Sequence, residues 1–197
     1  MLNKLLIPIL FISFPAYAHM FVGKVGFYDG LSHPVLGVDH FIAMVSVGII
    51  SAQIGEKKIW TIPITFVGMM ILGGFAGMLN EVKFIIDEEL VYVVVEYGII
   101  LSVILLGLVI AIDKKFSILL TMIFISFFGL CHGIAHGMEM PWASNPLLFA
   151  SGFASGTAIL HLFGVITGSL LIKNTYLYLL LRIVGLISCL YGILLLV

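Results

Sequence analysis

The chain has 197 residues, of which 62% are hydrophobic and 10% are charged, and its formal net charge is −1. Because soluble domains carry about 25% charged residues, this composition excludes a disordered chain, a coiled coil and a water-soluble domain with an ordinary polar surface. The small net charge gives no basis for nucleic-acid binding. The class that remains is a single domain that crosses a lipid bilayer several times.

The first 18 residues have the pattern of a cleavable secretory signal peptide. Lys4 gives a basic start, residues 5–14 are apolar, and residues 15–18 (PAYA) supply the small residues of a cleavage site. We expect cleavage after Ala18, which would make His19 the N-terminus, where its amine and imidazole could capture a metal ion. The alternative is an uncleaved seventh membrane helix.

Six apolar segments follow the signal peptide, and each is long enough to cross the ~30 Å hydrocarbon core as a helix. They lie near residues 34–54, 59–79, 89–111, 116–136, 147–172 and 175–197. The segments lack the period-two alternation of a β-barrel. We therefore predict an all-α integral membrane protein, with one six-helix transmembrane domain over residues 19–197. Its two three-helix halves would have opposite orientations, which is compatible with an inverted repeat.

The basic residues of the loops predict how these spans are oriented. Lysines occupy alternate loops, at Lys57 and Lys58, at Lys114 and Lys115, and at Lys173, whereas the opposite loops are mainly acidic. Loops rich in lysine and arginine face the cytoplasm. We therefore expect the mature N-terminus and the C-terminus to lie on the periplasmic side.

The first motif with metal-ligating character opens the first span. His33 is followed by Pro34, which suits the first turn of a helix, and then by Asp39 and His40, about two turns further inside. A carboxylate with two imidazoles suits Ni²⁺, Co²⁺, Zn²⁺ or Cu²⁺ and poorly suits Ca²⁺ or Mg²⁺. The alternative is a buried Asp–His hydrogen-bonded pair that fixes a helix contact.

The second motif lies at the outer end of the fourth span. His132 and His136 are four residues apart and share one helix face, which Glu139 extends three residues later. This is not the H-E-x-x-H motif of zinc proteases, because position 133 is glycine. The alternative is a pair of interfacial histidines bonded to neighbouring groups.

Depth along the helices connects the two motifs. Asp39, His40, His132 and Glu96 should all lie ~7–10 Å below the outer surface, counted at 1.5 Å per residue. We therefore predict one polar cluster near the periplasmic mouth, with Glu96 as a possible capture residue. His161 lies ~20 Å deep by the same count. It is either a later station on a path or a lone histidine bonded to a backbone carbonyl.

Together these motifs resemble those of the HupE/UreJ family of nickel/cobalt permeases, and the resemblance runs along the whole chain. Its most specific segments are residues 26–34 (GFYDGLSHP), 37–44 (GVDHFIAM) and 132–141 (HGIAHGMEMP). The resemblance implies a secondary permease of the bacterial inner membrane that imports Ni²⁺ or Co²⁺ and so indirectly supplies a nickel or cobalt enzyme. It places the metal site on residues of the two motifs: His33, Asp39, His40, His132, His136 and Glu139.

Other functions stay open on the sequence alone. An intramembrane zinc hydrolase could use the same histidines and aspartate to activate water, a haem could bind between His40 and His136, and the chain could be a metal sensor or a partner subunit. The permease hypothesis requires no permanently bound cofactor. Zn²⁺ or Cu²⁺ could replace Ni²⁺ or Co²⁺ as the transported ion. The expected partners are the metal ion and the lipid bilayer, and a homo-oligomer is possible.

Overall fold

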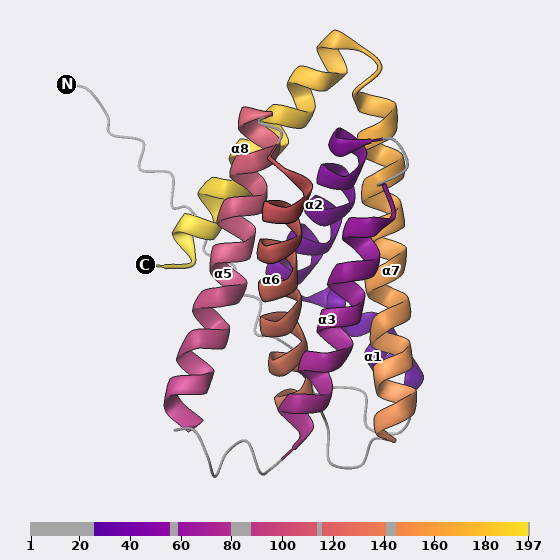
Figure 1. Cartoon of the computed structure of the whole chain (residues 1–197), viewed down its shortest axis with the longest axis vertical. Coiled ribbons are helices and arrows are strands. Elements are labelled where there is room, and N and C mark those ends of the chain that lie inside the picture. The colour runs from indigo at the N-terminus through magenta and orange to yellow at the C-terminus, as the bar shows by residue number, and fades with distance from the viewer. Residues whose placement is uncertain (1–25, 56–58, 80–87, 114–115, 141–144, 197) are drawn as a thin grey trace, which may run out of the picture.

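A computed structural model describes residues 26–55, 59–79, 88–113, 116–140 and 145–196. Within these ranges every regular element is an α-helix, as Figure 1 shows. In chain order the helices are α1 (Phe27–Leu36), α2 (Val38–Ile54), α3 (Thr61–Met78), α5 (Glu88–Ile112), α6 (Ile118–Glu139), α7 (Pro146–Leu171) and α8 (Thr175–Leu194). The predicted all-α membrane class is confirmed. The predicted signal peptide, His19 and the lysines at 57, 58, 114 and 115 lie outside the described residues.

Five helices, from α3 to α8, are long and apolar enough to cross a membrane, and α1 with α2 forms a sixth candidate span. The bounds of the five lie within a few residues of the ranges predicted from hydropathy. Local sequence signals explain where two of them begin. The Asn145 side chain accepts hydrogen bonds from the backbone N–H groups of Leu147 and Leu148, and Asn174 does the same for α8.

The first span differs from the prediction because it is not one helix. α1 and α2 meet at an angle of 85°, and Gly37 between them has an extended backbone with φ −82° and ψ 117°. Pro34 was expected in the first turn of the span, but it lies inside α1, near the end of that helix. Since proline has no N–H to donate to the carbonyl four residues earlier, it weakens the last turn of α1. Asp39 therefore lies in the first turn of α2 rather than two turns inside a span.

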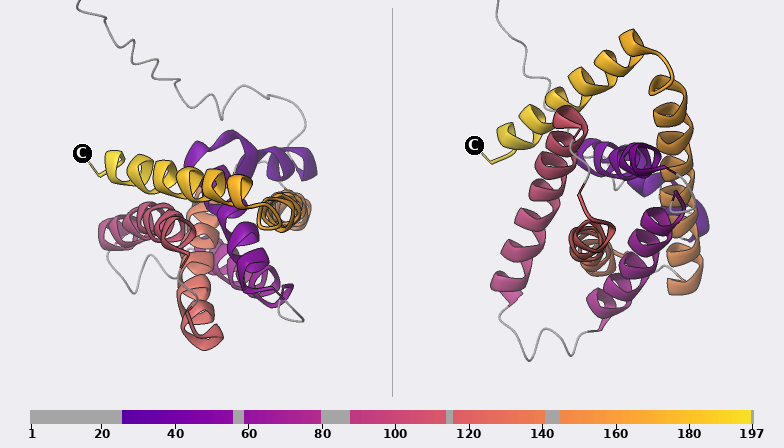
Figure 2. Two further views of the ribbon diagram at one scale, coloured as in Figure 1. Left: turned by 90° about the horizontal axis from the view of Figure 1, so that it is seen from above. Right: turned by 45° about the horizontal axis from the view of Figure 1, so that its top comes forward.

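Helices of the first half pack on helices of the second half. The main pairs are α3 with α6, α2 with α7 and α5 with α8, while α1 lies along α7 (Figure 1). α8 runs obliquely across the other helices in both views of Figure 2. If the two halves are repeats, α2 corresponds to α6, α3 to α7 and α5 to α8. The α2–α7 pair and the α6–α3 pair are then equivalent, so the observed pairing is compatible with inverted halves. The repeat itself stays a prediction.

Glycines lie where these helices touch. A Cβ at Gly133 of α6 would overlap the backbone carbonyl of Met70 on α3, and one at Gly164 of α7 would overlap the carbonyl of Val45 on α2. Only a residue without a side chain allows backbones to approach so closely. The glycines at these positions therefore serve helix packing.

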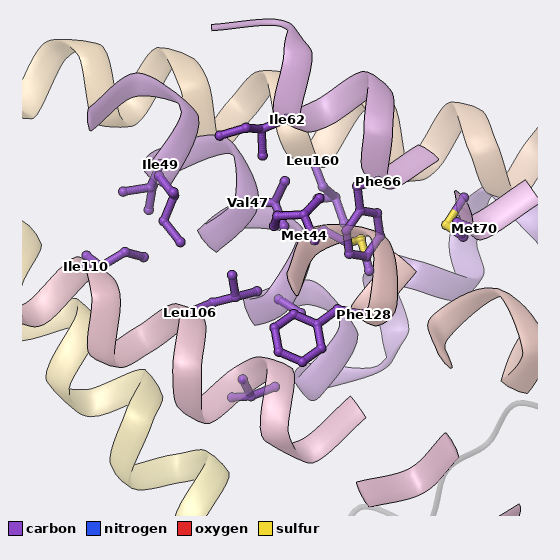
Figure 3. Packing of buried hydrophobic residues seen from close by; sticks show 14 of the residues in the cluster. Met44, Val47, Ile49, Ile62, Phe66, Met70, Leu106, Ile110, Phe128 and Leu160 are labelled. Atoms are coloured by element: carbon purple, nitrogen blue, oxygen red, sulfur yellow. The ribbon is translucent and has the colours of Figure 1, made fainter. Parts of the chain in front are cut away.

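The hydrophobic core lies between α2, α3, α5, α6 and α7 (Figure 3). Met44, Phe66 and Phe128 are almost completely buried there. Met44 follows His40 by one helical turn, but its place in the core fits packing better than metal binding. Cys131 is buried against Gly98, and Arg182 donates a hydrogen bond to the carbonyl of Ala111 near the C-terminal end of α5.

The α3–α6 contact gives a direct test of this packing. A Cβ at Gly73 would lie 2.5 Å from the carbonyl oxygen of Leu130, whereas a Cβ at Gly68 of the same helix meets nothing within 4 Å. We expect Gly73→Ala to lower the free energy of unfolding by about 1–3 kcal/mol, as overpacking does. Gly68→Ala should leave it unchanged or raise it by up to about 1 kcal/mol. Reversible unfolding in mixed detergent micelles measures both variants, and equal effects would contradict the close backbone contact.

Candidate metal site

Four histidines from three helices meet near the bend between α1 and α2. His33 comes from α1, His40 from α2, and His132 and His136 from α6. The His136 ring lies 4.6 Å from the His33 ring and 4.5 Å from the His40 ring, measured between centroids. The His40 and His132 rings are 4.7 Å apart. The two sequence motifs therefore come together in one cluster.

The cluster contains two groups of three side chains whose ligand atoms all lie within 4.8 Å of one another. The inner group, as we call it, is His40, His132 and His136; the outer group is His33, His136 and Glu139. Each group has the ligand number and the donor types that a divalent transition metal accepts from protein. Both groups include His136, which makes this residue the link between them.

Exposure falls from the outer group to the inner group. The side chains of Glu139 and His33 are 57% and 27% exposed, whereas His136 is 2% and His132 is 0% exposed. His40, the third member of the inner group, is 14% exposed. The outer group therefore reaches the protein surface, and the inner group is more deeply buried.

Hydrogen bonds hold two of the three inner rings. His40 Nδ1 lies 3.0 Å from the carboxylate Oδ1 of Asp39, and His132 Nε2 lies 3.0 Å from the hydroxyl of Ser102 on α5. The other nitrogen of each ring, His40 Nε2 and His132 Nδ1, is buried with no hydrogen-bond partner among the described residues. Such orphaned nitrogens are the atoms that a metal would bind, since metal-bound histidines use their second nitrogen for a hydrogen bond.

His136 differs from these two rings because neither of its nitrogens has a hydrogen-bond partner in the described part of the chain. Its Nδ1 lies 3.9 Å from Glu139 Oε2, beyond hydrogen-bond distance. The ring packs on Phe153 of α7, at a centroid distance of 4.1 Å. The ring shared by both groups is thus positioned by packing alone.

Three carboxylates lie near the cluster. Among the described residues Asp39 belongs to neither group, and its contact with His40 is the hydrogen-bonded pair that the sequence left open as an alternative to metal binding. Glu96 is partly buried on α5 and interacts electrostatically with Glu139, Asp39 and His40. Carboxylates beside the cluster favour the approach of a cation.

His161 lies deeper than the cluster. It is 1% exposed, and neither ring nitrogen has a hydrogen-bond partner among the described residues. The backbone carbonyl partner, one of the two alternatives for His161, is therefore not found among them. Phe66 packs against both His161 and His132, with ring centroids 5.2 Å and 5.6 Å away. An aromatic ring thus contacts both the inner group and the buried histidine beyond it.

The sequence analysis overlooked Ser102, Phe66 and Phe153. Ser102 is the single serine in the apolar 25-residue helix α5, and that small polar side chain is the signal that could have identified it. Phe66 and Phe153 carry no such signal, because phenylalanine is common in membrane helices. Their contact with histidines depends on the tertiary arrangement alone.

Comparison with known proteins gives a consistent family assignment. The model for the family described as HupE / UreJ protein matches residues 7–195. Protein HupE of Rhizobium leguminosarum bv. viciae is 35% identical over 170 residues, which cover 85% of this chain and 84% of the relative. No solved structure matches the chain.

The bend at Gly37 provides a test of the site's geometry. A Cβ at Gly37 would lie 3.2 Å from both Asp39 Oδ1 and His40 Nδ1, although the backbone angles of Gly37 suit any residue. We expect Gly37→Ala to disturb the Asp39–His40 pair and to weaken Co²⁺ binding by about 10-fold or more, as loss of an outer-shell partner does. Titration of the purified protein with Co²⁺ measures this, with Gly68→Ala as the control, and equal affinities would contradict the tight fit.

Proposed function

The chain belongs to the HupE/UreJ family, and from this premise we propose that it is a secondary permease that imports Ni²⁺ or Co²⁺ across the bacterial inner membrane. The family is related to nickel and cobalt transport rather than to catalysis, which disfavours the zinc hydrolase. The observation that carries the proposal is the sharing of His136 by an exposed and a buried ligand group. A purely structural metal site has no need for a second group that leads to the surface.

In this proposal the outer group captures the ion. His33 Nε2 lies 3.5 Å from Glu139 Oε2. These two side chains are the more exposed members of the group, so a hydrated cation can reach them first. Glu96 adds negative charge beside them. His19, if cleavage makes it the N-terminus, would be an additional capture ligand from outside the described residues.

The ion then moves to the inner group through His136. Because His136 is a member of both groups, two ions cannot each hold a complete set of three ligands at the same time. Ions therefore pass one by one. His136 can turn between the groups since no hydrogen bond within the described residues holds its ring.

Beyond the inner group we propose His161 as the next station. Its buried nitrogens are free to bind an ion, and Phe66 packs on both His132 and His161. The Phe66 ring must shift for an ion to pass. This step separates the periplasmic ligands from the cytoplasmic half of the path.

The charge of the ion provides a driving force for import, and the ligand types of the site limit which ions can bind. An inward-negative membrane potential supplies ~4.6 kcal/mol per divalent ion at 100 mV, twice the value for one charge, so no coupling ion is required. Imidazole nitrogens with one carboxylate accept Ni²⁺ and Co²⁺ and also Zn²⁺ or Cu²⁺, and the relation of the family to nickel and cobalt transport favours the first two ions. The metal is the transported substrate, and the proposal includes no resident cofactor. The product would be metal for a nickel or cobalt enzyme in the cytoplasm.

Uptake by cells that lack their own importers tests the proposal. We expect cells with the unmodified chain to accumulate radiolabelled Ni²⁺ or Co²⁺, and His136→Ala to abolish accumulation because it removes a ligand from both groups. Cys189→Ala is the control, since Cys189 is buried on α8 and belongs to neither group. No uptake by the correctly inserted unmodified chain would disprove a permease that acts alone.

The two ligand groups should also separate kinetically. We expect His33→Ala to raise the half-saturating metal concentration at least 10-fold while much of the maximal uptake rate is retained, because capture is weakened but the inner group is intact. His132→Ala should lower the maximal rate, because it removes a ligand of the inner group. Initial uptake rates over a range of metal concentrations, at matched membrane levels, provide both parameters. Identical kinetic defects in the two variants would argue against two successive groups.

A further inference from the structure

Ser102 lies beside the inner group but belongs to none of the sequence motifs. It is completely buried on α5, and its hydroxyl oxygen has two close polar neighbours. The carbonyl oxygen of Ile99 is 2.6 Å away, and His132 Nε2 is 3.0 Å away. The direction in which the hydroxyl hydrogen points therefore determines which nitrogen of the His132 ring carries a hydrogen.

The shorter of the two contacts decides where the hydroxyl hydrogen lies. A carbonyl oxygen can only accept, so an oxygen–oxygen distance of 2.6 Å requires that Ser102 donates its hydrogen to Ile99. The Ser102 oxygen is then left with lone pairs toward His132. The contact at Nε2 is a hydrogen bond only if the imidazole donates.

This direction determines the tautomer of His132. With its hydrogen on Nε2, the neutral ring has its lone pair on Nδ1. His132 Nδ1 is also the nitrogen that is buried with no partner among the described residues. Asp39 acts in the same way on His40, because a carboxylate can only accept, so that Nδ1 donates and Nε2 keeps the lone pair.

We propose that Ser102 is a positioning residue that holds His132 as the Nε2–H tautomer and so presents Nδ1 to the metal in the inner group. The proposal rests on the proposed function, since it gives the inner group its ligand atoms: Nδ1 of His132 and Nε2 of His40. His136 is the third ligand and is not held in this way.

Ser102→Ala tests this inference, and Ser188→Ala is its matched control. Ser188 is also a buried serine whose hydroxyl donates to a helix carbonyl, that of Val184 at 2.9 Å, but it lies on α8 and touches no histidine of the cluster. Alanine is a good helix former, so both variants should insert and fold. The two variants therefore differ mainly in the hydrogen bond to His132.

The first readout is the tautomer itself, in the metal-free full chain labelled with ¹⁵N-histidine in lipid nanodiscs. The His132 signals are assigned by their loss in His132→Asn. We expect one Nε2–H tautomer in the unmodified chain and in Ser188→Ala, and a mixture of tautomers in Ser102→Ala. An unchanged His132 spectrum in Ser102→Ala would overturn the proposal.

The second readout is the affinity for Co²⁺, followed by its visible absorption in the same protein. We expect Ser102→Ala to weaken binding by about 10- to 100-fold, the usual effect of losing an outer-shell partner, and Ser188→Ala to leave it unchanged. Equal affinities for the unmodified chain and Ser102→Ala would overturn the proposed role of Ser102 and leave the proposed function standing. Failure of the unmodified chain to bind Co²⁺ or Ni²⁺ would instead overturn the proposed function, while the tautomer spectrum would still report on Ser102.

Discussion

The close approach of helix backbones is the constraint on which the rest of the structure depends. Gly133 lies between His132 and His136 on α6 and lets this helix touch α3 directly, where any side chain would strike the carbonyl of Met70. Gly164 does the same for α7 against α2. Lipid provides little hydrophobic force between helices, so such packing supplies much of the association energy. This packing also directs the histidine face of α6 toward His33 on α1 and His40 on α2.

The histidine cluster has a cost that this packing must offset. Six ring nitrogens of His40, His132, His136 and His161 are buried with no hydrogen-bond partner among the described residues, and an unsatisfied buried polar group costs about 1–3 kcal/mol. A fold selected for stability alone would pair or replace them. Lone pairs that face one another across less than 5 Å are, by contrast, what a cation needs. In the proposed function, the unmet hydrogen-bonding capacity of His40, His132 and His136 would be satisfied by a bound metal ion.

Hydropathy and motif spacing predict much of this molecule, because both reflect local chemistry. The long apolar runs of α3, α5, α6, α7 and α8 follow from the cost of an unpaired backbone in lipid, and the spacing of His132, His136 and Glu139 follows from the helical period. The bend at Gly37 escapes such reasoning, since hydropathy predicts one continuous span over residues 34–54 and does not show that α1 packs along α7. Ser102 escapes it as well, because its partner lies on another helix. Tertiary contacts decide both features. Asp39 Oδ1 lies 3.0 Å from His40 Nδ1, and the role of Asp39 as a metal ligand stays a prediction.

The inner group combines two hydrogen-bonded rings with one ring, His136, that is held by packing, and in the proposed function this difference suits transport better than storage. Rings held by Asp39 and Ser102 need little reorganisation when an ion arrives, so their lone pairs bind without a large loss of conformational entropy. If the third ring were held equally firmly, the ion would be trapped, because it would have to break three well-placed bonds at once. His136 lacks hydrogen-bond partners among the described residues, and in the proposed mechanism it follows the ion from the outer group and then releases it. Rapid passage requires binding that is favourable but divided among successive steps, and an imidazole shared by two ligand groups provides that division with a single side chain.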